Sequence, residues 1–144
     1  MLEASRVAAK WWADKLRSKH PHHDMGDALG NAFLSLCSSC LEPIPADLVD
    51  RFETELSRLI DEEIASQLPG PNQRVKGWAP RVNCQAETIY APVGVLDDAM
   101  QAAGLADWSL AFPIYTGCSV FPDEVVVSEG YYAPRVTIWS AIPP

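Results

Sequence analysis

Hydrophobic residues recur at helical spacing through the first half of the chain. In residues 3–18, apolar side chains including Trp12 and Leu16 fall three or four positions apart. Residues 46–68 repeat this pattern over a longer stretch, and Pro45 suits the start of a helix. Both segments are therefore predicted to be amphipathic helices, each with one buried face.

A weaker pattern predicts a further helix between these two segments. Leu29 and Phe33 lie on one helical face, and Asp24 or Asp27 is a suitable N-cap. This helix should end before Pro43, because proline cannot continue it.

The last third of the chain changes to a β pattern. A short strand is expected at residues 88–90 and a helix at about 92–103, with Val93 facing inward and Gly104 as the C′ residue. Three β-prone runs separated by turn residues follow this helix: 112–120, 124–129 and 132–140.

Together these elements predict an α+β fold, with N-terminal helices packed on a small C-terminal antiparallel sheet of about three strands. The 144 residues, 48 % of them hydrophobic, are expected to form a single domain, 1–144. It would comprise a helical part (1–68), a Pro- and Gly-rich connection (69–83) and an α/β part (84–144). With no apolar run long enough for a membrane span and no secretion signal, a soluble cytoplasmic protein is expected.

The net charge of −8 is unevenly distributed. Residues 1–81 contain ten of the eleven Lys and Arg residues and twelve acids, whereas residues 82–144 contain seven acids and one base, Arg135. Such acidity repels phosphate backbones, so direct nucleic-acid binding is not expected. The acidity either serves solubility alone or suits a protein partner with a basic surface.

Two groups of residues could bind a metal ion. Cys37 and Cys40 form a CxxC motif late in a predicted helix, where core cysteines are favoured over a redox pair or half of a zinc site. His20, His22 and His23 share one loop and could join these cysteines in a zinc-stabilised interaction module. Their spacing matches no standard zinc finger, so no metal site and no cofactor is assigned.

Cys84 and Cys118 could each serve as the nucleophile of a small enzyme that modifies a host protein or a nucleotide signal. Cys118 alternates within a β run and is expected to be buried, whereas Cys84 is expected to be exposed. A Cys–His pair would require the 20–23 loop to fold over the β part. No P-loop, GxGxxG, HExxH or GxSxG motif is present, so a non-enzymatic role is favoured and no catalytic residue is assigned.

The connection at residues 69–83 offers a further alternative. Arg74, Lys76 and Arg81 lie near Trp78 and could hold the phosphate and base of a signalling nucleotide. Basic loops of this kind are more often simply solvated.

Aromatic residues are concentrated around the β part. Some must cover the sheet, but Tyr131 and Tyr132 lie beside a turn and are followed closely by Arg135. Exposed Tyr and Arg side chains are typical anchors of protein interfaces. These three residues are therefore candidate anchors for a partner.

Several short segments form an ordered series along most of the chain: Val7–Arg17 with its two tryptophans, Tyr90-Ala91-Pro92, Ala103-Gly104-Leu105, Phe112-Pro113 with Thr116, and Gly130-Tyr131-Tyr132-Ala133-Pro134. The series resembles a family of small proteins encoded by bacteriophages and prophages. This chain departs from the family pattern at the 20–23 loop and at Cys37 and Cys40. The resemblance implies phage origin and a protein that binds and blocks a host protein, as anti-CRISPR proteins do.

Charge, size and this resemblance together predict an inhibitor of a host defence protein. A CRISPR–Cas effector is the leading candidate, because it holds nucleic acid in a strongly positive channel. Tyr131, Tyr132 and Arg135 would anchor the partner, and a homodimer is left open. Electrostatic contact is assigned to acids on the 46–68 helix: Glu53, Glu55, Asp61, Glu62 and Glu63.

Overall fold

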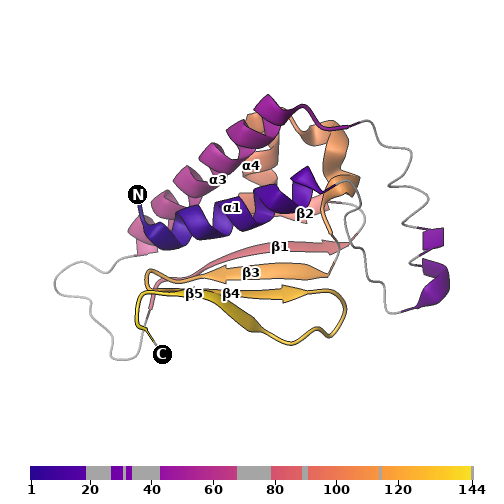
Figure 1. Ribbon diagram of the computed structural model, residues 1–144. Helices are drawn as coiled ribbons and strands as arrows, with labels where there is room; N and C mark the ends of the chain where they lie inside the picture. Colours follow the sequence, from indigo (N-terminus) through magenta and orange to yellow (C-terminus); the bar gives the residue numbers. More distant parts are fainter. Residues whose placement is uncertain are drawn as a thin grey trace.

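Helices and one antiparallel sheet form two layers (Figure 1). The computed structural model describes residues 1–18, 27–30, 32–33, 43–67, 79–88, 91–113 and 115–143. The predicted α+β class is confirmed. The sheet, however, has five strands rather than about three.

Helices α1 (Glu3–Arg17) and α3 (Ala46–Gln67) pack against each other and follow the predicted bounds to within one residue. The buried face of α1 is rich in alanine, which lets the two helices approach closely. At the start of α3, the carbonyl of Pro45 accepts the N–H groups of Leu48 and Val49. The apolar periodicity therefore identified both helices and most of the residues on their buried faces.

The segment between these helices is described only in part. Residues 28–30 and 32–33 are helical. The backbone N–H of Gly30 donates to Asp27 Oδ1 at 2.5 Å, so Asp27 takes the N-cap role that the sequence suggested. The remainder of this predicted helix lies outside the described residues.

The sheet has the strand order β2-β1-β3-β4-β5, with every neighbouring pair antiparallel. Its strands are β1 (Val82–Thr88), β2 (Ala91–Val93), β3 (Thr116–Val120), β4 (Glu124–Glu129) and β5 (Val136–Ser140). The last three strands form the meander predicted from the three β-prone runs.

Of the short strand expected at 88–90, Thr88 is the last residue of β1, while 89 and 90 lie outside the described residues. The strand itself begins earlier than expected, at Val82, inside the predicted connection. Its inward residues Val82, Cys84 and Ala86 alternate with polar ones, but Val82 is the one strong β-former among these three. Pairing with β3 on one side and β2 on the other holds β1 in place despite that weak propensity.

Helix α4 (Val95–Ala103) begins three residues later than predicted, because Pro92 and Val93 belong to β2. Val93 was expected to face inward but is 45 % exposed. Gly94 forms the turn between β2 and α4, with φ of 62°. Gly104 ends α4 with φ of 80°, as the sequence predicted.

One face of the sheet lies against the helices and forms the core with them (Figure 1). Trp12, Phe52 and Phe112 meet there, with ring centroids 6.2 Å and 5.6 Å from Phe112. Figure 1 shows no described helix over the opposite face of the sheet. No helix among the described residues is long and apolar enough to cross a membrane.

Candidate functional site

Three tyrosines gather at one end of the sheet, beside the turn between β4 and β5. The ring centroids of Tyr115 and Tyr131 are 5.0 Å apart, and those of Tyr131 and Tyr132 are 4.2 Å apart. Their exposed fractions are 37 %, 42 % and 89 %, respectively. We call these three residues the tyrosine corner; the cluster is unrelated to the buried Greek-key motif of the same name. Large aromatic surfaces left in solvent in one cluster are typical of recognition sites.

The backbone of the tyrosine corner is held in an unusual conformation. Tyr115 and Tyr132 have φ of 51° and 53°, and they are the only non-glycine residues with positive φ in the described ranges. Such values are uncommon for bulky residues, and strained backbone of this kind clusters at binding and active sites. The Gly130 N–H donates to the Tyr115 carbonyl at 3.1 Å, which ties the two segments together.

The tyrosine corner stands beside a pocket of about 380 Å³ on the sheet. Gly117 lies between Gln85 on β1 and Ser128 on β4. Because glycine has no side chain, the backbone of β3 forms the floor of the pocket at this position. A Cβ placed on Gly117 would lie 3.7 Å from the Gln85 side chain and 3.9 Å from the Cys84 carbonyl oxygen, which is ordinary van der Waals contact, so a side chain can start there without a clash.

None of the described residues that line this pocket carries an ionised group at neutral pH. A side-chain hydrogen bond with Tyr132 raises the pKa of Tyr131, so its phenol stays protonated. Phenols, the Gln85 amide and the Ser128 hydroxyl can donate and accept hydrogen bonds. The pocket therefore suits a neutral group with polar edges, such as a peptide segment, and is poorly suited to phosphate.

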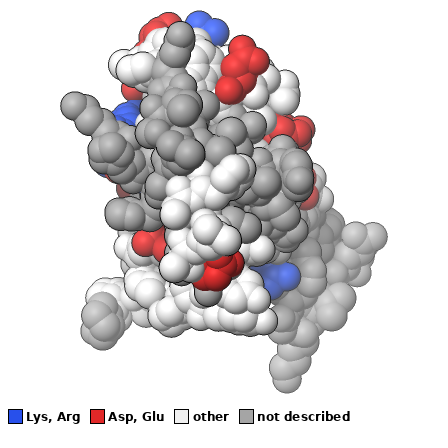
Figure 2. Space-filling view, turned by 90° about the vertical axis from the view of Figure 1, so that its right-hand side faces the viewer, with Lys and Arg blue, Asp and Glu red and all other residues white. Residues whose placement is uncertain are grey.

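Figure 2 shows the end of the molecule that lies at the right of Figure 1, where the β4–β5 turn is found. Uncharged residues occupy much of the described surface in this view, with acidic and basic side chains scattered around them.

Arg135, the third predicted anchor, is exposed just before β5. Its Nη2 lies 3.4 Å from Ser119 Oγ, and Ser119 in turn donates to Asn83 at 3.0 Å. Arg135 thus extends across the sheet without lining the tyrosine pocket. The structure brings the two predicted tyrosines together and adds Tyr115 and the glycine-floored pocket to them.

The five acids assigned to electrostatic contact do not form one face of α3. Asp61 accepts hydrogen bonds from the Leu2 N–H at 3.1 Å and the Ser5 hydroxyl at 2.6 Å. Its carboxylate therefore fastens the start of α1 to α3. That role leaves Asp61 poorly placed to meet a partner.

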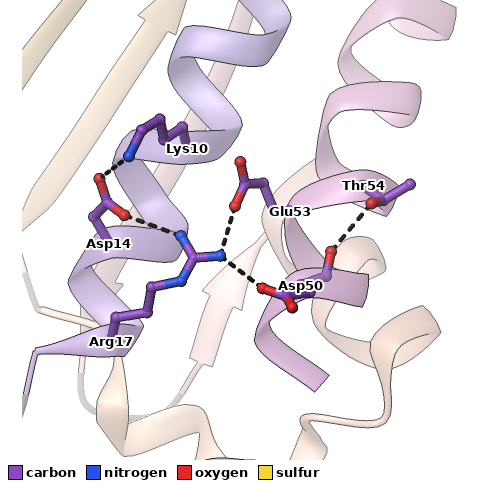
Figure 3. A network of polar contacts seen from close by, with 6 residues as sticks. All are labelled: Lys10, Asp14, Arg17, Asp50, Glu53 and Thr54. Atoms are coloured by element: carbon purple, nitrogen blue, oxygen red, sulfur yellow. Dashed lines mark hydrogen bonds and ion pairs between the residues drawn. The ribbon is translucent and has the colours of Figure 1, made fainter. Parts of the chain in front are cut away.

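Glu53 also faces α1, where Arg17 joins the two helices (Figure 3). The Arg17 guanidinium lies 2.7 Å from Glu53, 2.9 Å from Asp50 and 2.9 Å from Asp14. Partly exposed ion pairs of this kind contribute modestly to stability, about 0–1 kcal/mol each. Their main consequence is that Glu53 is already paired within the molecule, with a guanidinium that it shares with Asp50 and Asp14.

The remaining acids lie on the outer surface of α3. Arg58 forms ion pairs with both Glu55 and Glu62, while Glu63 accepts a hydrogen bond from Gln67 at 3.0 Å. Glu55, Glu62 and Glu63 therefore remain candidates for long-range attraction of a basic partner. The positive charge of Arg58, between Glu55 and Glu62, partly offsets their negative charge.

Cys84 was expected to be exposed, and this expectation is wrong. Cys84 and Cys118 are directly opposite on β1 and β3, and both are buried beneath the helices. Burial raises the pKa of Cys84 to about 12 and raises that of Cys118 as well, with the neighbouring thiol adding to the second shift. Thiols that stay protonated and out of solvent are poor nucleophiles.

The other predicted sites cannot be placed. His20, His22, His23, Cys37, Cys40, Arg74, Lys76 and Trp78 lie outside the described residues. Within the described ranges, no cluster of three or more His, Cys, Asp or Glu side chains could hold a metal ion. Arg81 is described: its backbone N–H donates to the Gln67 side chain at 2.9 Å.

Neither a protein-family model nor a curated protein sequence matches the chain.

Proposed function

We propose that the protein is a binding module that holds a partner protein at the tyrosine corner. The main support for this proposal is the combination of three exposed tyrosines, two of them at positive φ, with a pocket whose described lining is uncharged. Tyrosine, serine and glycine are also the residues that antibody paratopes favour, because they combine rigid aromatic area with adaptable hydrogen bonding. The pocket would receive an apolar or proline side chain of the partner, and the phenols would bond to its backbone.

The partner that we propose is a host defence protein with a basic nucleic-acid-binding surface, with a CRISPR–Cas effector as the leading candidate. This part of the proposal is supported by the net charge of −8 and by the resemblance to phage-encoded proteins. In this scheme the overall negative charge accelerates the encounter, and the tyrosine corner fixes the complex. A pull-down from host lysate, with the captured protein identified by mass, provides the partner for the two tests below.

Replacing the exposed tyrosines should weaken partner binding at least tenfold. Tyr131→Ala and Tyr132→Ala each remove an aromatic anchor, and such anchors contribute about 2 kcal/mol or more. Gly117→Val should have a similar effect, because it fills the pocket from below while its ordinary φ tolerates a side chain. Affinity would be measured by titration calorimetry with the captured partner.

Phe33→Ala is the matched control for these variants. Phe33 is 58 % exposed and is not among the residues that line the pocket, so its loss should leave the affinity unchanged. Equal effects of Phe33→Ala and Tyr132→Ala, or full binding by Gly117→Val with an unchanged melting temperature, would remove the tyrosine corner from the interface.

Reversing the outer acids of α3 should slow association rather than abolish the complex. In a Glu55→Lys, Glu62→Lys, Glu63→Lys triple variant, the association rate is expected to fall about tenfold at low salt, with little change in the dissociation rate. The difference should shrink as salt screens it, since the Debye length is about 8 Å at physiological ionic strength. Stopped-flow kinetics at several salt concentrations would measure it. An unchanged rate at low salt would exclude the electrostatic part of the proposal.

A further inference from the structure

The two edges of the sheet are built differently. The β2 edge is three residues long and contains Pro92, which has no N–H to offer another strand. The β5 edge is five residues long and carries no charged residue. Among the described residues, no strand pairs with its outer side. Proteins usually protect such edges with proline or charge, so an uncharged, unpaired edge indicates a site for another strand.

A largely apolar groove runs beside this edge on the helix side. It measures about 300 Å³ and is lined in part by Trp11 from α1 and by Val136 and Ile138 from β5, with Glu129 as its one charged residue among those described. The exposed fractions of Val136 and Ile138 are 52 % and 37 %. The pairing of β4 with β5 skips Ile138, which lies at an irregularity between Thr137 and Trp139. The unpaired edge thus continues into an apolar surface that a second strand could cover.

Charge is distributed unequally along the β5 edge. Arg135 precedes the strand, whereas Asp123 and Glu124 lie beside its far end, where the Ala141 N–H donates to the Asp123 carbonyl at 2.8 Å. None of these three charged residues forms an ion pair within the described part of the chain. A strand that approaches antiparallel, with a base at its start and acids beside its end, would match both ends of this edge. The β5 strand of a second copy has this arrangement.

We propose that two copies of the chain pair through their β5 strands, antiparallel, about a twofold axis near Ile138. Neighbouring strands lie about 4.8 Å apart, so Glu124 and Asp123 of one copy lie about two strand spacings from Arg135 of the other. An arginine side chain that leaves Ser119 and turns outward over the joined edge can span that separation. A twofold axis perpendicular to the sheet keeps both helix layers on one side, where the two grooves beside Trp11 meet. The interface is isologous and makes each contact twice.

The mass of the full chain in solution tests this pairing without any partner protein, so its outcome is independent of the proposed function. Sedimentation equilibrium should show wild-type protein moving from 15.8 kDa towards twice that mass as concentration rises. Ile138→Lys places a charge on the joined edge and should keep the protein monomeric, with an unchanged circular dichroism spectrum. Val93→Lys is the matched control, because it makes the same kind of change on the exposed β2 edge and should still dimerise.

A charge exchange tests the antiparallel arrangement. Arg135→Glu should weaken dimerisation about tenfold, because two symmetric attractions become repulsions. Adding Glu124→Arg to that variant should restore the wild-type dissociation constant. Wild-type protein that stays monomeric at all concentrations, an Ile138→Lys dimer or a failed charge rescue would each overturn the proposal. If wild-type protein stays monomeric, the alternative is that an extended strand of another protein pairs with the β5 edge.

Discussion

Trp12→Ala is expected to destabilise the protein more than any other single truncation in α1. The Trp12 side chain is fully buried and contacts Phe112, which also meets Phe52 from α3. Truncation of a buried tryptophan costs about 3–5 kcal/mol, a large part of the roughly 5–15 kcal/mol that stabilises a typical domain. The melting temperature should fall by roughly 10 °C or more in a thermal scan followed by circular dichroism.

Trp12→Phe separates the packing contribution from the polar one. The indole Nε1 is buried and has no hydrogen-bond partner among the described residues, and a buried unpaired donor costs about 1–3 kcal/mol. Phenylalanine retains most of the aromatic contact and removes that donor. Trp12→Phe should therefore lie much closer to wild type than Trp12→Ala does.

Trp11→Ala provides the comparison at the neighbouring position. Trp11 is only partly buried, with Lys15 Nζ 4.7 Å from its ring centroid, so its truncation should cost clearly less. Equal losses of melting temperature in Trp11→Ala and Trp12→Ala would contradict the packing of α1 described above. Together the three variants compare how much three features contribute to stability: the buried aromatic contact of Trp12, its unpaired Nε1 donor, and the partly exposed ring of Trp11.

The helices could be predicted because each carries its own signal. Apolar residues at intervals of three and four gave α1 and α3 to within one residue, and Gly104 marked the end of α4. The strand β1 gave no comparable signal, because Cys84 and Ala86 have weak β propensity and depend on their neighbours in the sheet. A strand held mainly by tertiary contacts is hard to recognise from local sequence.

The candidate site shows the same division between local and tertiary information. Tyr131 and Tyr132 could be proposed as anchors because they adjoin a turn, whereas Tyr115 and Gly117 join them only through the pairing of β3 with β4. The acids of α3 were misjudged for a related reason. Spacing along one helix says nothing of the neighbouring helix, and it is α1 that engages Glu53 and Asp61.

Cys84 and Cys118 are expected to resist alkylation in the folded protein almost completely. Only the thiolate reacts, and burial raises the pKa of Cys84 to about 12 from its ordinary value of 9.0. That shift alone lowers the thiolate population on the order of a thousandfold at neutral pH, because each pKa unit is a factor of ten. Exclusion of the reagent from the sheet–helix interface slows the reaction further.

Iodoacetamide labelling with peptide-level mass spectrometry measures each cysteine separately. In guanidinium chloride both thiols should label at the rate of an unfolded chain, which supplies the reference for the protection factor. Rapid labelling of Cys84 in folded protein would contradict its burial and revive the thiol-enzyme alternative. Slow labelling at both positions, with partner binding retained in a folded Cys84→Ala, Cys118→Ala variant, would show that these thiols belong to the core. The functional search could then concentrate on the tyrosine corner, where exposed aromatic surface and an open pocket lie together.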